Sequence, residues 1–196
     1  MTDHHHPHEM APIERRVAAL EELLSKAGVI PEGFIDETIR RYEEDIGPMN
    51  GAKVVAHAWT DPDFKERLLA DAPRAIAELG FDSEESHALE VVENTDTVHN
   101  VVVCTLCSCY PWPLLGLPPA WYKDNPYRAR VVREPRQVLA EMGCELPDDV
   151  EIRVWDSSAE KRYLVLPLRP EGTENTPPDE LAGLVSRDSM IGVARL

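Results

Sequence analysis

Hydrophobic and polar positions repeat with two different periods along this chain, and the change of period divides it into parts. From residue 13 to residue 80, apolar residues recur at the three- and four-residue spacing of amphipathic helices. From residue 89 onward, short runs rich in valine, isoleucine and leucine favour β-strands. The pattern predicts an α+β protein with a disordered, histidine-containing start at 1–12, a helical N-terminal arm at 13–80 and a layered α/β domain at 81–196.

Several helices are expected in the N-terminal arm. The first begins at Ile13 and is closed by Gly28, and the second runs from Pro31 to Gly47. Asp61 followed by Pro62 is typical of a helix N-terminus, and helices are also expected over 51–59 and 72–79. The apolar faces of the first two helices pack either on the chain's own core or on a partner.

The second part is expected to contain four strands. They are predicted at 89–93, 98–103, 150–155 and 162–168, with helices over 120–125 and 127–142, an interruption at Pro135, and a last helix from Pro178. The segment 111–119 contains four prolines and is expected to be a stiff loop.

Composition limits the functional classes. The formal net charge of -16 argues against nucleic-acid binding, which requires a basic surface. No apolar segment approaches the roughly 18 residues needed to cross a bilayer, and no secretory signal is visible, so a cytoplasmic location is expected.

Three of the four cysteines, Cys104, Cys107 and Cys109, lie within six residues at the end of a predicted strand. Thiolates are soft metal ligands, and a cation relieves their mutual repulsion, so this claw loop (residues 104–109) is interpreted as a metal site. The one-residue separation of Cys107 and Cys109 places the peptide nitrogens of Ser108 and Cys109 between the sulfur atoms. If these nitrogens lose their protons, the loop offers five donors and leaves one position open for catalysis.

Other interpretations of the cysteines and histidines are kept. One is a structural zinc site with Cys144 as the fourth ligand; a disulfide is disfavoured because cytosolic thiols stay reduced. Three histidines are either additional ligands or ordinary packing and surface residues: His57, His87 and His99. Four more at the start of the chain either bind a metal or assist its delivery, or belong to a disordered terminus: His4, His5, His6 and His8.

The sequence VVVCTLCSCYPWP at 101–113, with the segments at 115–119, 121–123, 128–136, 151–158 and 187–192, resembles the alpha subunit of nitrile hydratase. The resemblance covers nearly everything from Ile13 onward. It implies that 81–196 is a metal-binding catalytic domain that holds one cobalt(III) per alpha subunit, with iron(III) less expected. The ligands would be the sulfur atoms of Cys104, Cys107 and Cys109 and the backbone nitrogens of Ser108 and Cys109. Thr105 favours the cobalt branch, because the iron branch has serine there.

The resemblance also implies that Cys107 becomes a sulfinic acid and Cys109 a sulfenic acid. The expected reaction is hydration of a small nitrile to an amide, a hydro-lyase activity, with Cys109 and Ser108 as catalytic residues. Trp112 is expected to line the substrate pocket, and Asp156, Glu160 and Arg162 to surround the metal centre as outer residues.

In the family, arginines of a separate beta subunit bind the oxidised sulfurs. The expected assembly is therefore a heterodimer of alpha and beta subunits, the latter as one chain or two, paired into a heterotetramer or similar, and the N-terminal helices are expected to contact the partner. Two alternative functions are a thiocyanate hydrolase subunit, which shares the cysteine motif, and a non-catalytic metal-binding module.

Overall fold

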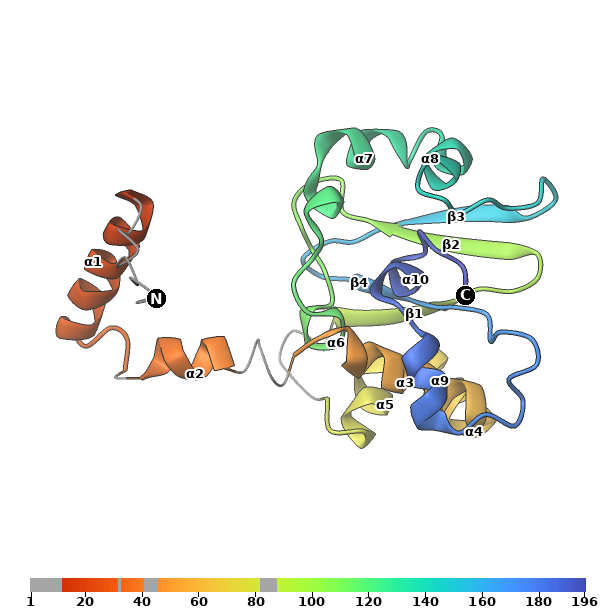
Figure 1. The fold of residues 1–196 in the computed structure, drawn as a ribbon, viewed down its shortest axis with the longest axis horizontal. Helices are drawn as coiled ribbons and strands as arrows, with labels where there is room; N and C mark the ends of the chain where they lie inside the picture. Colours follow the sequence, from red (N-terminus) through yellow and green to blue (C-terminus); the bar gives the residue numbers. More distant parts are fainter. Residues whose placement is uncertain (1–11, 32, 41–45, 82–87) are drawn as a thin grey trace, which may run out of the picture. The chain divides into compact units, whose positions relative to one another are not determined.

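The N-terminal helices form a unit of their own. The computed structural model describes residues 12–31, 33–40, 46–81 and 88–196, and the chain divides into the units Met1–Glu43 and Glu44–Leu196 (Figure 1). The first unit contains α1 (Pro12–Lys26) and α2 (Phe34–Arg40). No described side chain of either helix is buried, and Val17, Leu20 and Leu23 each expose more than half of their surface. Packing within the described part of this unit therefore leaves the apolar face of α1 uncovered.

The next three helices belong to the second unit. These are α3 (Pro48–Thr60), α4 (Pro62–Ala70) and α5 (Ala72–Glu78). The Asp61 carboxylate accepts a hydrogen bond from the Phe64 N–H at 3.0 Å, which confirms the predicted N-cap of α4. All three helices contribute fully buried side chains to the core, among them Val54, Phe64 and Ile76. The observed division therefore follows Glu43, whereas the sequence pattern placed it after residue 80.

The strands form two parallel pairs. Strand β1 (Leu89–Glu93) pairs with β4 (Arg162–Leu166), and β2 (Val98–Val103) pairs with β3 (Glu151–Asp156). Figure 1 shows these strands between α7 and α8 on one side and α3, α4, α5 and α9 on the other. The expected α+β class, with layers of helices and strands and a loop after β2, is confirmed.

The remaining helices are short. They are α6 (Trp112–Leu115), the 3-10 helix η3 (Ala120–Lys123), α7 (Asn125–Arg130), α8 (Pro135–Glu141), α9 (Pro178–Leu184) and α10 (Arg187–Ile191). The predicted interruption of the helical region 127–142 at Pro135 is confirmed, because α7 ends at Arg130 and α8 begins at Pro135. Helices α6 and α10 were not predicted. None of the helices in the described ranges is both long enough and apolar enough to cross a membrane.

The turn after α10 lies against the strand that leads to the cysteines. Gly192 has a φ of 89°, and a Cβ atom there would lie 2.0 Å from the Asn100 carbonyl oxygen of β2. The buried His99 ring places Nε2 at 2.8 Å from the Gly192 carbonyl oxygen. Since a carbonyl oxygen only accepts, Nε2 carries the proton, and Nδ1 faces the Asn94 amide at 3.4 Å. Helix α10 is thereby fixed to β2.

Candidate metal centre

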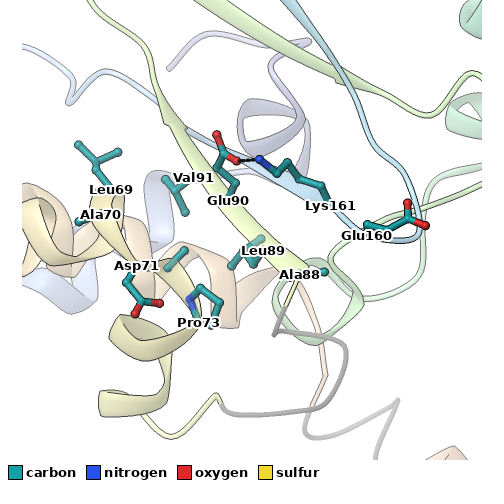
Figure 2. A pocket seen from close by; sticks show the side chains of 11 residues that line it. Leu69, Ala70, Asp71, Pro73, Ala88, Leu89, Glu90, Val91, Glu160 and Lys161 are labelled. Carbon is teal, nitrogen blue, oxygen red and sulfur yellow. Dashed lines mark ion pairs between the residues drawn. The ribbon is translucent and has the colours of Figure 1, made fainter.

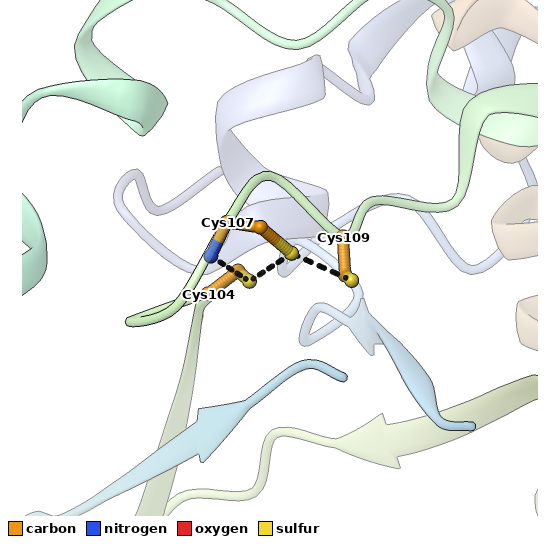
Figure 3. A group of neighbouring side chains, drawn as sticks. All are labelled: Cys104, Cys107 and Cys109. Carbon is orange, nitrogen blue, oxygen red and sulfur yellow. Dashed lines mark hydrogen bonds between the residues drawn. The ribbon is translucent and has the colours of Figure 1, made fainter. Parts of the chain in front are cut away.

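The claw loop follows β2 directly and brings three sulfur atoms together. The Sγ atoms of Cys104 and Cys107 are 3.4 Å apart, and those of Cys107 and Cys109 are 3.1 Å apart. All three lie within 4.8 Å of one another (Figure 3). The Cys107 N–H donates to Cys104 Sγ at 3.2 Å, which is the local bond that curls the loop around the first sulfur. The sequence spacing therefore produces one convergent donor set.

The thiols differ in their surroundings. Cys104 is fully buried, Cys109 is half-buried and Cys107 is exposed. Hydrogen bonds from the neighbouring thiols of Cys109 and Cys104 lower the pKa of Cys107 to about 7. Burial, together with the neighbouring thiols of Cys107 and Cys104, raises the pKa of Cys109 to about 12. The Cys107 thiolate therefore forms readily, whereas ionisation of Cys109 is unfavourable until a cation balances the negative charge.

The start of the claw loop is attached to the end of β3. The Asp156 carboxylate accepts from the Thr105 N–H at 2.9 Å and from the Thr105 hydroxyl at 2.5 Å. The Ser157 N–H donates to the Val103 carbonyl oxygen at 2.7 Å. Parallel pairing of Val103 with Asp156 brings these residues to the same end of the two strands. The predicted outer residue Asp156 thus contacts the claw loop directly.

The middle and end of the loop are attached to the segment after α6. Arg128 of α7 donates from Nη1 to the Cys107 carbonyl oxygen at 2.7 Å. The buried Tyr122 hydroxyl of η3 donates to the Cys109 carbonyl oxygen at 3.0 Å, and Tyr127 bonds the Val102 carbonyl oxygen at 2.8 Å. Motif reasoning missed these three residues, because they act through the backbone carbonyls of the loop. Their only sequence signal is that they lie in or beside segments that carry the family resemblance.

Other predicted site residues take different positions. Ser108 is half-buried within the loop, and Trp112 begins α6 with 36% of its surface exposed. Glu160 accepts a hydrogen bond from the Ser158 hydroxyl at 3.0 Å in the turn before β4, where Arg162 is half-buried. Glu160 and Lys161 line a cavity of about 440 Å³ between the α4–α5 region and β1, with Lys161 paired to Glu90 (Figure 2). No claw cysteine lines this cavity, so it is separate from the cysteine cluster.

The candidate ligands outside the loop have other neighbours. Cys144 is buried with its Sγ atom 3.9 Å from His99 Nε2, and burial raises the pKa of this thiol. His57 packs edge-on against Phe64, with ring centroids 4.4 Å apart. Within the described residues, no other cysteine and no histidine joins Cys104, Cys107 and Cys109 as a fourth ligand of the cluster. His87 and the four N-terminal histidines lie outside the described residues.

The residues present fit a transition metal better than structural zinc. Three soft sulfur donors converge, and the peptide nitrogens of Ser108 and Cys109 lie between the Cys107 and Cys109 side chains along the backbone. No fourth thiolate or imidazole completes a tetrahedron in the described ranges. Fold and site together define a mixed α/β metalloprotein whose ligands come from one short loop. A position left open for substrate is what a catalytic centre requires.

Comparisons with known proteins agree with this class. The family model for the nitrile hydratase alpha chain matches residues 11–194, and the chain belongs to that family. It is 57% identical over 188 residues to the low-molecular-weight cobalt-containing nitrile hydratase subunit alpha of Rhodococcus rhodochrous, covering 96% of this chain and 91% of that one. The thiocyanate hydrolase subunit gamma of Thiobacillus thioparus is 42% identical, with 94% of this chain and 83% of that one covered.

A solved structure gives the same result for the fold. A doubly substituted Fe-type nitrile hydratase from Comamonas testosteroni Ni1 superposes with a TM-score of 0.90 at 45% identity, covering 96% of this chain and 92% of that chain. The resemblance found in the cysteine motif is thereby confirmed over nearly the whole sequence.

Proposed function

We propose that this chain is the metal-bearing alpha subunit of a cobalt nitrile hydratase, an enzyme that adds water to a nitrile to form an amide. The observation that carries the proposal is the convergence of Cys104, Cys107 and Cys109 within 4.8 Å in a chain of this family. A loop with three thiols and two available peptide nitrogens provides the donors for a low-spin trivalent ion and leaves one position for substrate.

The ligands and their modifications are assigned as follows. Cys104, Cys107 and Cys109 bind through sulfur, and Ser108 and Cys109 bind through their peptide nitrogens. Cys107 becomes a sulfinic acid and Cys109 a sulfenic acid. The low pKa of Cys107 and its exposure support oxidation there, since the thiolate is the form that oxidants attack.

The reaction uses groups of the claw loop and of α6. When bound, cobalt(III) supplies Lewis acidity toward the nitrile nitrogen. The Cys109 sulfenate oxygen acts near the nitrile carbon, either as nucleophile toward that carbon or as base toward the attacking water, and the Ser108 hydroxyl holds the substrate. Trp112 forms an apolar wall of the pocket. Asp156 orients the loop through Thr105, and Glu160 and Arg162 are assigned to the outer surroundings of the centre.

Cobalt is assigned in preference to iron. The cobalt-containing relative is 57% identical, compared with 45% for the Fe-type structure, and the motif contains Thr105 rather than serine. Cobalt is also consistent with the thiolate-rich donor set.

A beta subunit, as one chain or two, completes the enzyme. The alpha-chain family implies such a partner, and the uncovered apolar face of α1, with Val17, Leu20 and Leu23, supplies a surface for it. We place the enzyme in the cytoplasm as a heterodimer of alpha and beta subunits, paired into a heterotetramer or similar assembly.

A thiocyanate hydrolase subunit is the second candidate, because the gamma subunit of that enzyme is 42% identical over most of its length. The purified chain with its co-purifying subunit should be assayed in parallel on a small organic nitrile and on thiocyanate. Amide formation from the nitrile supports the proposal. Turnover of thiocyanate alone would assign the chain to the second function.

Elemental analysis and mass spectrometry of the loop peptide test the metal assignment. The expected result is cobalt, with two added oxygens on Cys107 and one on Cys109. Zinc with unmodified cysteines would falsify the hydratase assignment and support a non-catalytic metal-binding module.

A further inference from the structure

The contact between Arg128 and the claw loop falls on a chemically special peptide. The Nη1 atom of Arg128 donates to the carbonyl oxygen of Cys107 at 2.7 Å. This carbonyl group and the Ser108 nitrogen belong to the same peptide bond. Of the two peptides proposed to bind metal through nitrogen, this is the one whose oxygen accepts a hydrogen bond from a cation.

Nitrogen ligation changes the charge on that oxygen. When the Ser108 nitrogen binds a metal cation in place of its proton, the proton passes to solvent and one negative charge remains on the peptide. Resonance shares this charge between the nitrogen and the Cys107 carbonyl oxygen. A guanidinium already bonded to the oxygen therefore interacts more strongly with the metal-bound peptide than with the neutral one, because the hydrogen bond becomes charge-assisted on both sides.

The surroundings of Arg128 leave its charge available. Among the described residues no carboxylate forms an ion pair with Arg128, and its Nε atom is buried without a hydrogen-bond partner. By contrast Arg130, two positions along the same helix, is engaged by Glu134 and Glu141. The Arg128 guanidinium thus has the Cys107 carbonyl as its hydrogen-bonded acceptor in the described part of the chain.

Tyr122 provides an internal comparison. Its hydroxyl donates to the Cys109 carbonyl oxygen at 3.0 Å, but that carbonyl belongs to the peptide of Tyr110 N, which is not a proposed ligand. Both side chains attach the same loop to the same neighbouring segment. Only Arg128 acts on a peptide that becomes charged.

We infer that Arg128 is a positioning residue of the metal centre: its guanidinium stabilises the negative charge that the Cys107–Ser108 peptide carries when its nitrogen binds the metal. This inference rests on the proposed cobalt centre. It goes beyond it by assigning to the alpha chain itself a cation that supports peptide-nitrogen ligation.

The test compares Arg128→Met, Arg128→Lys and Tyr122→Phe with the wild type, each purified with its co-purifying subunit from cells grown with and without cobalt. Infrared difference spectra between the cobalt-loaded and metal-free forms are recorded with ¹³C in the cysteine carbonyls, and separately in the serine carbonyls. In the wild type, the Cys107 carbonyl contributes a labelled band that is expected to move to lower frequency on loading, because nitrogen ligation weakens its C=O bond. The other three cysteine carbonyls precede peptide nitrogens that are not proposed ligands.

Arg128→Met is expected to change the size of this cysteine shift and to leave unaffected the serine band that moves on loading. That band is assigned to Ser108, because of the eight serine carbonyls of this chain only this one precedes a proposed ligand nitrogen. It should also speed cobalt loss to EDTA about tenfold or more, the scale of one charge-assisted hydrogen bond. Arg128→Lys should restore most of the retention, and Tyr122→Phe should keep the wild-type cysteine shift on loading.

Two results would overturn the inference. The first is that Arg128→Met keeps the wild-type cysteine shift and the wild-type cobalt retention. The second is that Tyr122→Phe loses as much of the cysteine shift and of the cobalt retention as Arg128→Met, which would make both residues general anchors of the loop. These outcomes are independent of nitrile turnover, so they are distinguishable from failure of the proposed function. Circular dichroism of each variant establishes that its fold is retained, and Arg128→Lys provides the test in a variant of nearly unchanged size.

Discussion

The close approach of Gly192 to β2 predicts that Gly192→Ala destabilises the second unit and loosens the claw loop. The added Cβ would lie 2.0 Å from the Asn100 carbonyl oxygen and 2.9 Å from the Val101 Cα atom. Both are backbone atoms of a strand paired with β3, so no flexible side chain can move to make room. The strand or the turn after α10 must shift by about 1 Å to restore ordinary contact.

The cost follows from two effects. Overpacking of a well-packed interior costs about 1–3 kcal/mol, and holding alanine at a φ of 89° costs about 1–2 kcal/mol. Restricting the unfolded chain returns about 0.4–1 kcal/mol. The expected loss in unfolding free energy is about 1–5 kcal/mol, which for a unit of this size lowers Tm by about 2–20 °C.

Thermal unfolding followed by circular dichroism measures this effect, and cobalt retention reports the claw loop at the end of the same strand. Gly183→Ala is the matched control, because Gly183 lies in α9 with no atom within 4 Å of the added carbon. It should be neutral or raise stability by up to about 1 kcal/mol. A Gly192→Ala protein with unchanged Tm would refute the packing argument.

Three further predictions concern residues around the loop. Asp156→Ala removes two hydrogen bonds to Thr105, each worth about 0.5–1.5 kcal/mol for an exposed acceptor. Hydrogen exchange of the Thr105 amide should therefore become about tenfold faster or more, relative to the exposed control Asp148→Ala. Unchanged exchange would contradict this. Burial lowers the pKa of His99 below 6.5, so the folded state binds fewer protons than the unfolded state between these pKa values. The unfolding free energy should therefore fall as the pH drops from 6.5 toward the lowered pKa. In denaturant titrations His99→Gln should flatten this dependence on pH, and an unaltered slope would exclude His99 as its source. Cys109→Ser should lose cobalt and activity with the fold retained, whereas retained turnover would remove the sulfenate from the mechanism.

Local sequence signals predicted most of the elements but not their partners. Asp61 with Pro62 specified the start of α4, and valine-rich runs specified β2, because capping and side-chain alternation act over a few residues. The parallel pairing of β2 with β3 joins positions about fifty residues apart, and no local pattern encodes it. Helix α6 was missed because Pro111 and Pro113 indicate a stiff loop, and only the folded chain shows that Trp112–Leu115 forms one turn.

The site shows the same limit. Cysteine spacing was enough to predict that the three sulfur atoms converge, since Cys104, Cys107 and Cys109 are constrained by a short loop. Tyr122 and Arg128 were not predicted, because a side chain that binds a backbone carbonyl leaves no characteristic residue pair in the sequence. Glu160 was expected near the centre and lies in the turn beside a separate cavity, where its role stays a prediction.

The three side chains that hold the claw loop come from positions far along the chain. Asp156 lies 51 residues from Thr105, Arg128 lies 21 residues from Cys107, and Tyr122 lies 13 residues from Cys109. A synthetic peptide copying residues 104–109 would contain every sulfur and nitrogen donor but none of these restraints. Such a miniature would bind metals in a mixture of geometries, so transplanting this chemistry into another scaffold requires the surrounding frame as well as the motif.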